Sequence, residues 1–230
     1  MRQFIDLSQP LEHGQPNFAY DPKISVTTHQ KISILGYNMA QITMGTHQGT
    51  HLDAPFHFIA DGKTIDQMKL EQFFGEASLI DLAPGSFLAA GTNLTVAMFK
   101  PFESLFRPGA KIIYRTGWDR LAGQEEYFTG FPSLELEAAE WIANRKIGLL
   151  GMDTPTPSRE WLKCHHLLLA HETEIVIVEG LINLDRLPGQ FTFIGFPLNI
   201  KGRDGAPIRA VAMIEAQTKP PRRHAHAAQG

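Results

Sequence analysis

Short apolar runs, separated by glycine, proline and asparagine, dominate the pattern of hydrophobic and polar positions along the chain. Runs of this kind that are rich in β-branched residues are typical of β-strands. We therefore expect a strand-rich protein, with a turn between strands over residues 201–205. The predicted strands cover residues 4–7, 24–28, 37–44, 77–82, 111–115, 147–152, 175–178, 190–200 and 208–214.

Longer segments with the helical period interrupt this series of strands. Residues 132–144 place apolar side chains on one face of a helix, and Ser133 is positioned to cap its first turn. Residues 158–170 repeat that spacing, and residues 93–99 are a weaker helix candidate. Because no repeat, linker or shift of composition divides the chain, residues 1–217 are predicted to form one α/β domain.

Composition narrows the class of protein. The chain has 230 residues, of which 43% are hydrophobic and 20% are charged, as in ordinary globular proteins. A net charge of −3 disfavours nucleic-acid binding, and no apolar stretch reaches the roughly 18 residues of a membrane span. Cys164 is the only cysteine, so a reducing, cytoplasmic setting is expected. Residues 218–230 lack apolar periodicity and are expected to form a disordered tail.

Ten histidines stand against that single cysteine, and three of them lie close to an aspartate in the sequence. His47, His51, Asp53 and His57 fall within eleven residues. Imidazole nitrogens and carboxylate oxygens are ligands that Zn²⁺ and Mn²⁺ accept without cysteine. An extended strand would separate His47 from His51 by about 13 Å. The backbone must therefore bend between them, and Gly49 permits that bend.

Two further features of this stretch favour one shared site over isolated, hydrogen-bonded histidines. Asp53 lies two residues after His51, so an extended backbone places both side chains on one face. Pro55 ends any central strand and suits a loop that brings His57 to the site from another direction. We therefore predict a metal site built from this stretch.

A second group of ligand-type residues follows far downstream. Glu179 ends a predicted buried strand, where a carboxylate is costly unless it is paired or bound to a metal. His165 and His166 are neighbours on a predicted helix, and spacing alone does not choose between them. Cys164 precedes them, so a nucleophilic thiol is a competing interpretation. A buried, inert cysteine is favoured, because no cysteine-protease signature surrounds it.

The stretch HQGTHLDAPFHF, residues 47–58, resembles the signature of the metal-dependent cyclase family, which includes bacterial kynurenine formamidases and isatin hydrolases. The likeness extends over nearly the whole chain except the tail. It is carried further by residues 5–11, 165–166, 178–181, 196–198 and 204–211.

This resemblance implies roles for the clustered residues. His47, His51 and Asp53 would bind a metal ion, and Asp53 would bridge to a second ion held by His165 and Glu179. His165 is preferred because the first histidine of the family's His-His-x-Leu pattern is the ligand. The implied cofactor is Zn²⁺ or Mn²⁺, as one or two ions. The implied fold is a strand-rich α/β domain of the swivelling β/β/α type, assembled as a homodimer or homotetramer.

Together with the resemblance, these residues predict a metal-dependent hydrolase of a non-peptide amide. His57 corresponds to the family's catalytic histidine. Its unperturbed pKa of about 6.5 suits it to take a proton from a metal-activated water and to return it to the leaving nitrogen. The expected substrate is an arylformamide such as N-formylkynurenine, which belongs to tryptophan catabolism. Phe18 and Tyr20 are expected to wall the pocket for its aromatic ring.

Two alternatives stay open. One is an isatin- or lactone-type ring hydrolase or cyclase, because the chain departs from the family pattern at two places that shape a pocket. Residues 18–22 lack a Pro-Gly pair, and residues 156–159 lack a second aspartate. The other is a non-catalytic metal-binding module. Its closed structural zinc sites would use four protein ligands, often thiolates, whereas this chain offers histidines and carboxylates.

Overall fold

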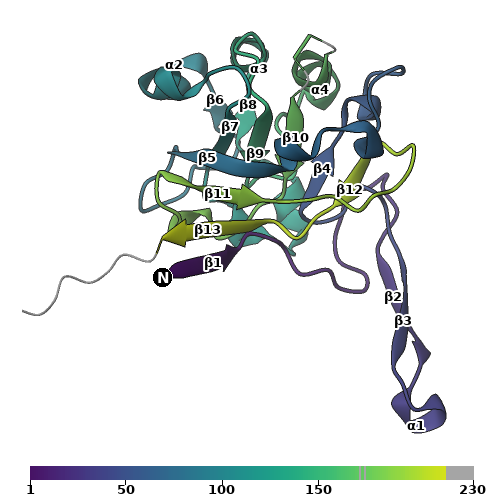
Figure 1. Ribbon diagram of the computed structural model, residues 1–230. Helices are drawn as coiled ribbons and strands as arrows, with labels where there is room; N and C mark the ends of the chain where they lie inside the picture. The colour runs from purple at the N-terminus through teal and green to yellow at the C-terminus, as the bar shows by residue number, and fades with distance from the viewer. Residues whose placement is uncertain (171, 174, 216–230) are drawn as a thin grey trace, which may run out of the picture.

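A nine-stranded sheet forms the body of the protein in the computed structural model, which describes residues 1–170, 172–173 and 175–215 (Figure 1). The predicted tail, residues 218–230, lies outside the described residues. The strand order is β1-β13-β11-β5-β7-β9-β10-β4-β12. The strands are β1 (Arg2–Asp6), β4 (His51–Asp53), β5 (Phe74–Asp81), β7 (Lys111–Arg115), β9 (Leu149–Met152), β10 (Val176–Glu179), β11 (Gln190–Ile194), β12 (Gly205–Pro207) and β13 (Val211–Glu215).

The centre of this sheet is buried on both faces. The strands β5, β7, β9 and β10 run parallel, and the outer strands pair antiparallel. Ile113 packs into one buried cluster and its neighbour Ile112 into another, as the alternation of side chains along a strand requires. The helices α2 (Val96–Phe99), α3 (Leu136–Ala143) and α4 (Trp161–Leu169) lie over one face (Figure 1). This double burial explains why the central strands are continuous apolar runs.

The strand-rich α/β class predicted from the sequence is confirmed, and the helix predicted over residues 158–170 is α4. The prediction omits two strands of the sheet, β4 and β12, which have three residues each. Both are too short to show a period, and β12 ends in Pro207, a residue typical of edge strands. The predicted turn forms at residues 201–202, but Gly205 opens β12, which pairs with β4.

The helix predicted over residues 132–144 starts later than expected. The helix α3 follows Glu135, which makes no side-chain capping bond. Ser133 does not cap this helix, because it belongs to a small parallel sheet formed by β6 (Asn93–Leu94) and β8 (Ser133–Leu134). The weaker helix candidate is divided between β6 and α2. In both places the sheet pairs segments far apart in sequence, which local helix signals do not report.

A β-hairpin stands away from the body of the protein (Figure 1). Its strands are β2 (Ser25–Gln30) and β3 (Met39–Thr43), with α1 (Ile32–Leu35) at the tip. Large apolar side chains are exposed on it: Ile32, Ile34, Leu35, Tyr37, Met39 and Ile42. The hairpin therefore carries an apolar surface that the body does not cover. Within the described ranges, no helix is long and apolar enough to cross a membrane.

Candidate metal centre

The pairing of β4 with β10 brings the two predicted ligand groups together. In this antiparallel pair His51 lies opposite Glu179, and Asp53 lies opposite Ile177. Residues two apart on a strand, and residues directly opposite across a pair, share a face of the sheet. His51, Asp53 and Glu179 therefore point to the same side, and all three are buried. The extended backbone predicted between His51 and Asp53 is confirmed.

The helix α4 adds a second imidazole to this face. His165 Nε2 lies 3.3 Å from Glu179 Oε1 and 3.5 Å from Asp53 Oδ2. His51 Nε2 lies 3.3 Å from Glu179 Oε2 and 3.4 Å from Asp53 Oδ1. His166 is exposed, whereas His165 is buried. The structure thus places His165 in the cluster and leaves His166 outside it, a choice that spacing alone did not make.

Backbone carbonyls orient these two imidazole rings. His51 Nδ1 donates to the Gly49 carbonyl at 3.0 Å, and His165 Nδ1 donates to the Trp161 carbonyl at 2.7 Å. Since a carbonyl only accepts, each Nδ1 carries a proton and each Nε2 faces the carboxylates, whose hydrogen bonds and charges outweigh burial and raise the pKa of both His51 and His165. Within the described chain, His51 Nε2 and Asp53 Oδ2 are buried without a hydrogen-bond partner. Carboxylates that draw a proton onto these imidazoles would draw a metal ion to the same place, so the donor set suits a metal ion.

His47 extends the cluster from the loop before β4, where Gly49 makes the predicted bend with φ +61°. Its Nδ1 lies 2.8 Å from Asp53 Oδ1, and its Nε2 lies 2.6 Å from Asp204 Oδ2. Burial lowers the pKa of His47, but the charge of Asp53 and the hydrogen bonds to Asp204 and Asp53 outweigh burial and raise it to about 9. Carboxylates that attract a proton this strongly also attract a metal ion.

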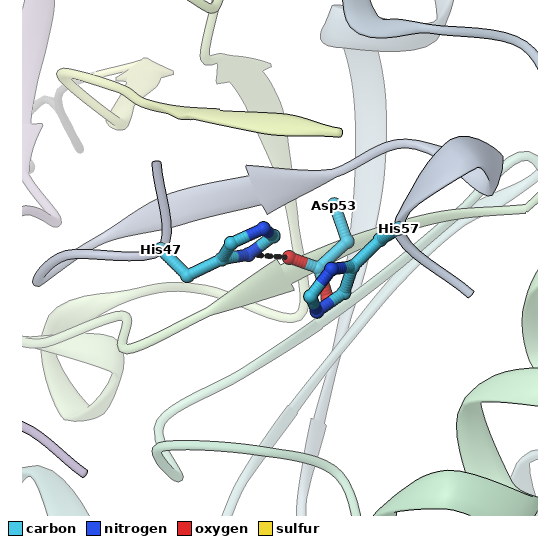
Figure 2. Close-up of side chains that lie close together, drawn as sticks. All are labelled: His47, Asp53 and His57. Atoms are coloured by element: carbon cyan, nitrogen blue, oxygen red, sulfur yellow. Dashed lines mark hydrogen bonds and ion pairs between the residues drawn. The ribbon is translucent and has the colours of Figure 1, made fainter. Parts of the chain in front are cut away.

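His57 reaches the same carboxylates from the short 3₁₀ helix Pro55–His57, as the position of Pro55 predicted. Its ring stacks on that of His47, with centroids 3.8 Å apart and planes at 22°. His57 Nδ1 lies 3.5 Å from Asp204 Oδ2. Figure 2 shows the rings of His47 and His57 converging on Asp53. The side chain of His57 is 26% exposed, so it lies at the open edge of the buried cluster.

Among the described residues, two groups of three hold candidate ligand atoms within 4.8 Å of one another. They are His47, Asp53 and His57, and His51, Asp53 and Glu179. Asp53 belongs to both groups, so its carboxylate could serve either of them. The first group also makes His57 a possible ligand as well as an acid–base group. The metal content of a variant that lacks the His57 imidazole distinguishes a metal ligand from an acid–base group.

Asp204 is the member of the site that sequence reasoning missed, because residues 201–205 were expected to form only a turn. It lies 157 residues after His47 in the chain. Asp204 Oδ2 accepts from His47 Nε2, and Thr46 Oγ1 donates to the same carboxylate. The hydrogen bonds from His47 and His57 lower the pKa of Asp204 well below its ordinary value, so it is ionised at neutral pH. No local spacing signal links it to the histidines, since the pairing of β12 with β4 creates the contact.

Gly205→Ala is expected to disturb this corner of the site. A Cβ atom at Gly205 would lie 2.5 Å from the Leu52 carbonyl oxygen and 2.7 Å from His47 Cε1. Overpacking of this kind costs about 1–3 kcal/mol, so urea unfolding should show a loss of that size together with weaker metal binding. Gly189→Ala is the matched control, because no atom lies within 4 Å of its added Cβ. Equal stability of the two variants would contradict the close approach of β12 to His47.

A cavity of about 550 Å³ opens onto the cluster. Seven aromatic residues line it, and they include both predicted substrate contacts: Phe18, Tyr20, Phe58, Tyr127, Phe128, Phe131 and Trp161. Phe18 packs edge-on against Phe128 with centroids 5.1 Å apart, whereas Tyr20 is fully exposed. Phe58 stacks on His165 at 4.4 Å. Aromatic side chains and the clustered histidines thus line one cavity. A larger hollow of about 1080 Å³ includes none of the clustered histidines.

Cys164 does not reach this cavity. It is buried, and burial raises the pKa of its thiol to about 12. A thiol with that pKa carries almost no thiolate at neutral pH. The prediction of an inert cysteine is confirmed, and the thiol-nucleophile interpretation is not supported by its surroundings.

The family of the chain follows from its similarity to known proteins. A family model described as "Putative cyclase" matches residues 5–159, which is more than half of the chain. The chain belongs to the cyclase family. The resemblance carried by the signature at residues 47–58 is therefore confirmed.

Individual relatives cover almost the full length of the chain. The kynurenine formamidase of Bacillus cereus is 31% identical over 219 residues, which span 91% of this chain and 96% of the relative. An isatin hydrolase A from Labrenzia aggregata, solved with benzyl benzoate, is 26% identical and has a TM-score of 0.82, covering 93% of this chain and 94% of that one. An isatin hydrolase solved with thioisatinate has a TM-score of 0.83 at 24% identity, over 93% and 92% of the two chains, and shows the shared fold.

Proposed function

We propose that the protein is a metal-dependent hydrolase of non-peptide amides, with arylformamides as its main substrate class. The observation that carries this proposal is the cluster of four histidines and three carboxylates at the inner end of an aromatic cavity. The names of the relatives support it, because a kynurenine formamidase and isatin hydrolases both cleave a C–N bond of a non-peptide amide.

The metal ligands in this proposal are divided between two ions. His47, His51 and Asp53 would hold the first ion, and Asp53, His165 and Glu179 would hold the second. The buried His51 Nε2 and Asp53 Oδ2 atoms, which have no hydrogen-bond partner among the described residues, support this arrangement. Nitrogen and oxygen donors of this kind suit Zn²⁺ and Mn²⁺. A bound divalent cation supplies a Lewis acid that polarises the carbonyl and lowers the pKa of water from 15.7 toward about 7.

His57 acts in this mechanism as the acid–base group. Asp204 Oδ2 faces His57 Nδ1 and holds the ring with its Nε2 edge available to the substrate. His57 Nε2 takes a proton from the attacking water and returns it to the amide nitrogen as the C–N bond breaks. The hydroxyl of the water ends on the carbonyl carbon, so the products are a carboxylate and an amine. Stacking on His47 restricts the ring to the orientation that this transfer needs.

The aromatic wall decides the class of amide. Phe18 and Tyr20 lie on the cavity wall, and Phe58 lies against the metal-site imidazole of His165. An aryl ring in this space brings an attached formamide to the cluster, as in N-formylkynurenine, and connects the protein with tryptophan catabolism. A cyclic amide of the isatin type is the second candidate, favoured by the structural likeness to isatin hydrolase A at 26% identity.

We also propose that residues 1–217 act as one hydrolase domain in a cytoplasmic homodimer or homotetramer. The pairing of β1 with β13 supports a single folding unit, and the single buried cysteine suits a reducing compartment. The exposed apolar hairpin from β2 to β3 supports assembly, because large exposed apolar patches mark protein interfaces. Sedimentation velocity checks the assembly, and a monomer at micromolar concentration contradicts it.

Removal of metal is expected to lower the melting temperature by about 5–10 °C. A ligand at 100 times its dissociation constant stabilises the folded state by about 2.7 kcal/mol, and each kcal/mol shifts the melting temperature of a chain of this size by about 2–4 °C. Calorimetry of the chelator-treated protein, with and without added Zn²⁺ or Mn²⁺, measures the change. An unchanged melting temperature contradicts the metal centre.

Hydrolysis is tested separately on the metal-loaded protein. Formanilides, isatin, lactones and cyclic imides cover the candidate substrates, and release of the amine or ring-opened acid is followed by absorbance. Turnover of a formanilide supports the proposal. Bound metal without hydrolysis of any amide or ester would show a non-catalytic metal-binding module instead.

A further inference from the structure

The cavity has one fixed cation on its wall. Among the described residues that line it, Arg159 is the only lysine or arginine. Arg159 follows Ser158 in the segment before α4, and Trp161 of α4 lines the same cavity. The cation therefore shares the cavity with the aromatic wall and with the clustered histidines.

The guanidinium group of Arg159 is held in place by neutral oxygen atoms. Its Nη2 donates to Asn93 Oδ1 at 2.7 Å and to the Gly91 carbonyl at 3.3 Å. Asn93 Nδ2 in turn donates to Glu135 Oε1 at 3.1 Å, which fixes the orientation of the Asn93 amide. The backbone N–H of Arg159 donates to Ser133 Oγ at 2.9 Å. Both the backbone and the head group of Arg159 are thus positioned before any substrate binds.

No carboxylate in the described part of the chain forms an ion pair with Arg159, so its positive charge is not neutralised within the protein. Asp21 lines the same cavity but forms no ion pair with Arg159. Among the described residues, the side-chain hydrogen bonds of Arg159 all come from Nη2, so its Nε–H and Nη1–H groups have no acceptor in this part of the chain. Guanidinium groups with free N–H donors bind carboxylates in a defined geometry.

We propose that Arg159 binds a carboxylate of the substrate, so that the preferred substrate is an aromatic amide that carries a carboxylate group away from the scissile bond. This inference rests on the proposed amide hydrolysis. In the bound state, the ring lies against the aromatic wall, the amide carbonyl lies at the metal ligands, and the carboxylate lies at Arg159. The arginine then determines specificity and takes no part in proton transfer.

Arg159→Gln tests this role on the metal-loaded enzyme. The substrates are the formamidobenzoates with the carboxylate at ring position 2, 3 or 4, compared with uncharged formanilide. For the formamidobenzoate that the native enzyme prefers, KM is expected to rise about 10-fold, the equivalent of one charge-assisted hydrogen bond at a partly solvated site. The kcat for that substrate, and both constants for formanilide, should change less than about 2-fold, because the metal ligands and His57 are untouched.

Lys163→Gln is the matched control. Lys163 lies on α4, pairs with Glu160 at 3.2 Å, is 71% exposed at its side chain, and does not line the cavity. The Lys163→Gln substitution removes one positive charge from the same region, so the KM of this variant for the formamidobenzoates should stay at the native value. Arg159→Lys keeps the charge without the planar head group and should restore part of the loss. An equal effect of Arg159→Gln on charged and uncharged substrates, or an effect of Lys163→Gln as large, overturns the proposal.

A binding measurement separates this proposal from the proposed function. Titration calorimetry with 2-, 3- and 4-aminobenzoate, the amine products, needs no turnover. Weaker binding of an aminobenzoate to Arg159→Gln, with unchanged binding of aniline, supports the carboxylate contact even if no formamide is hydrolysed. Equal affinity of the native and Arg159→Gln proteins for all three aminobenzoates overturns it, because a solvated surface arginine would behave in that way. Hydrolysis of the formamides by the native enzyme is measured separately and tests the proposed function alone.

Discussion

His57→Ala is expected to lower kcat by about 10²–10⁴-fold while the protein keeps its full metal content. This is the range contributed by a positioned general acid–base group. The ring of His57 lies at the open edge of the cluster, faces Asp204 through Nδ1 and stacks on His47. Its loss removes the proton carrier but leaves His47, His51 and Asp53 in place. Steady-state kinetics and elemental analysis of the same sample measure the two quantities.

The metal content of His57→Ala shows whether His57 is also a metal ligand. Loss of one ion in His57→Ala would assign His57 to the ligand group that it forms with His47 and Asp53. Full activity would remove His57 from the mechanism altogether. His166→Ala is the control, because His166 is exposed on α4 and lies outside the cluster. Partial recovery of His57→Ala by added imidazole is the further result expected of a missing acid–base group.

Asp53→Ala is expected to abolish both metal binding and turnover. Asp53 is fully buried and belongs to both groups of candidate ligands. Removal of a residue that merely orients a ligand costs about 10–100-fold in metal affinity, so the loss of a shared ligand should exceed 100-fold. Turnover should fall by about 10³-fold or more, because the Lewis acid contributes several kcal/mol to the transition state. Metal titration and kinetics measure the two losses.

Asp53→Asn distinguishes a lost ligand from a lost fold. The amide keeps the volume of the side chain inside the cluster but lacks the negative charge that attracts a divalent cation. Its far-ultraviolet circular dichroism should match that of the native protein, while metal affinity falls as in Asp53→Ala. Asp185→Ala, which removes a carboxylate that does not line the catalytic cavity, serves as control. Native metal affinity in Asp53→Asn would show that Asp53 is not a ligand.

The central strands of the sheet were predictable because the apolar pattern that marks each of them lies within a few consecutive residues. Burial on both faces makes β7, β9 and β10 continuous apolar runs, and such runs are visible without knowledge of their partners. The start of α3 was not predictable in the same way. Ser133 has the composition of a helix cap, but pairing with Asn93 assigns it to a strand. Local propensity is weak compared with a contact between distant segments.

The ligand signature was also local. His47, His51, Asp53 and His57 lie close in sequence, and the roles of Gly49 and Pro55 follow from their backbone restrictions. Spacing did not choose between His165 and His166, the family resemblance preferred His165, and the packing of α4 places His165 in the cluster because adjacent helical residues point in different directions. The contribution of Asp204 needed the pairing of β12 with β4, which joins segments from opposite ends of the chain.

The sequence by itself therefore determined the α/β class, the central strands, the ligand types and the family. Each of these depends on composition or on spacing within a few residues. The grouping of His165 and Glu179 with Asp53 was implied by the family resemblance, and the tertiary structure supplied its geometry. Only the tertiary structure decided that Asp204 supports His47 and His57 and that Arg159 shares a cavity with the histidines. These contacts depend on strand order and helix packing, and distances across a sheet are not encoded in the spacing along the chain.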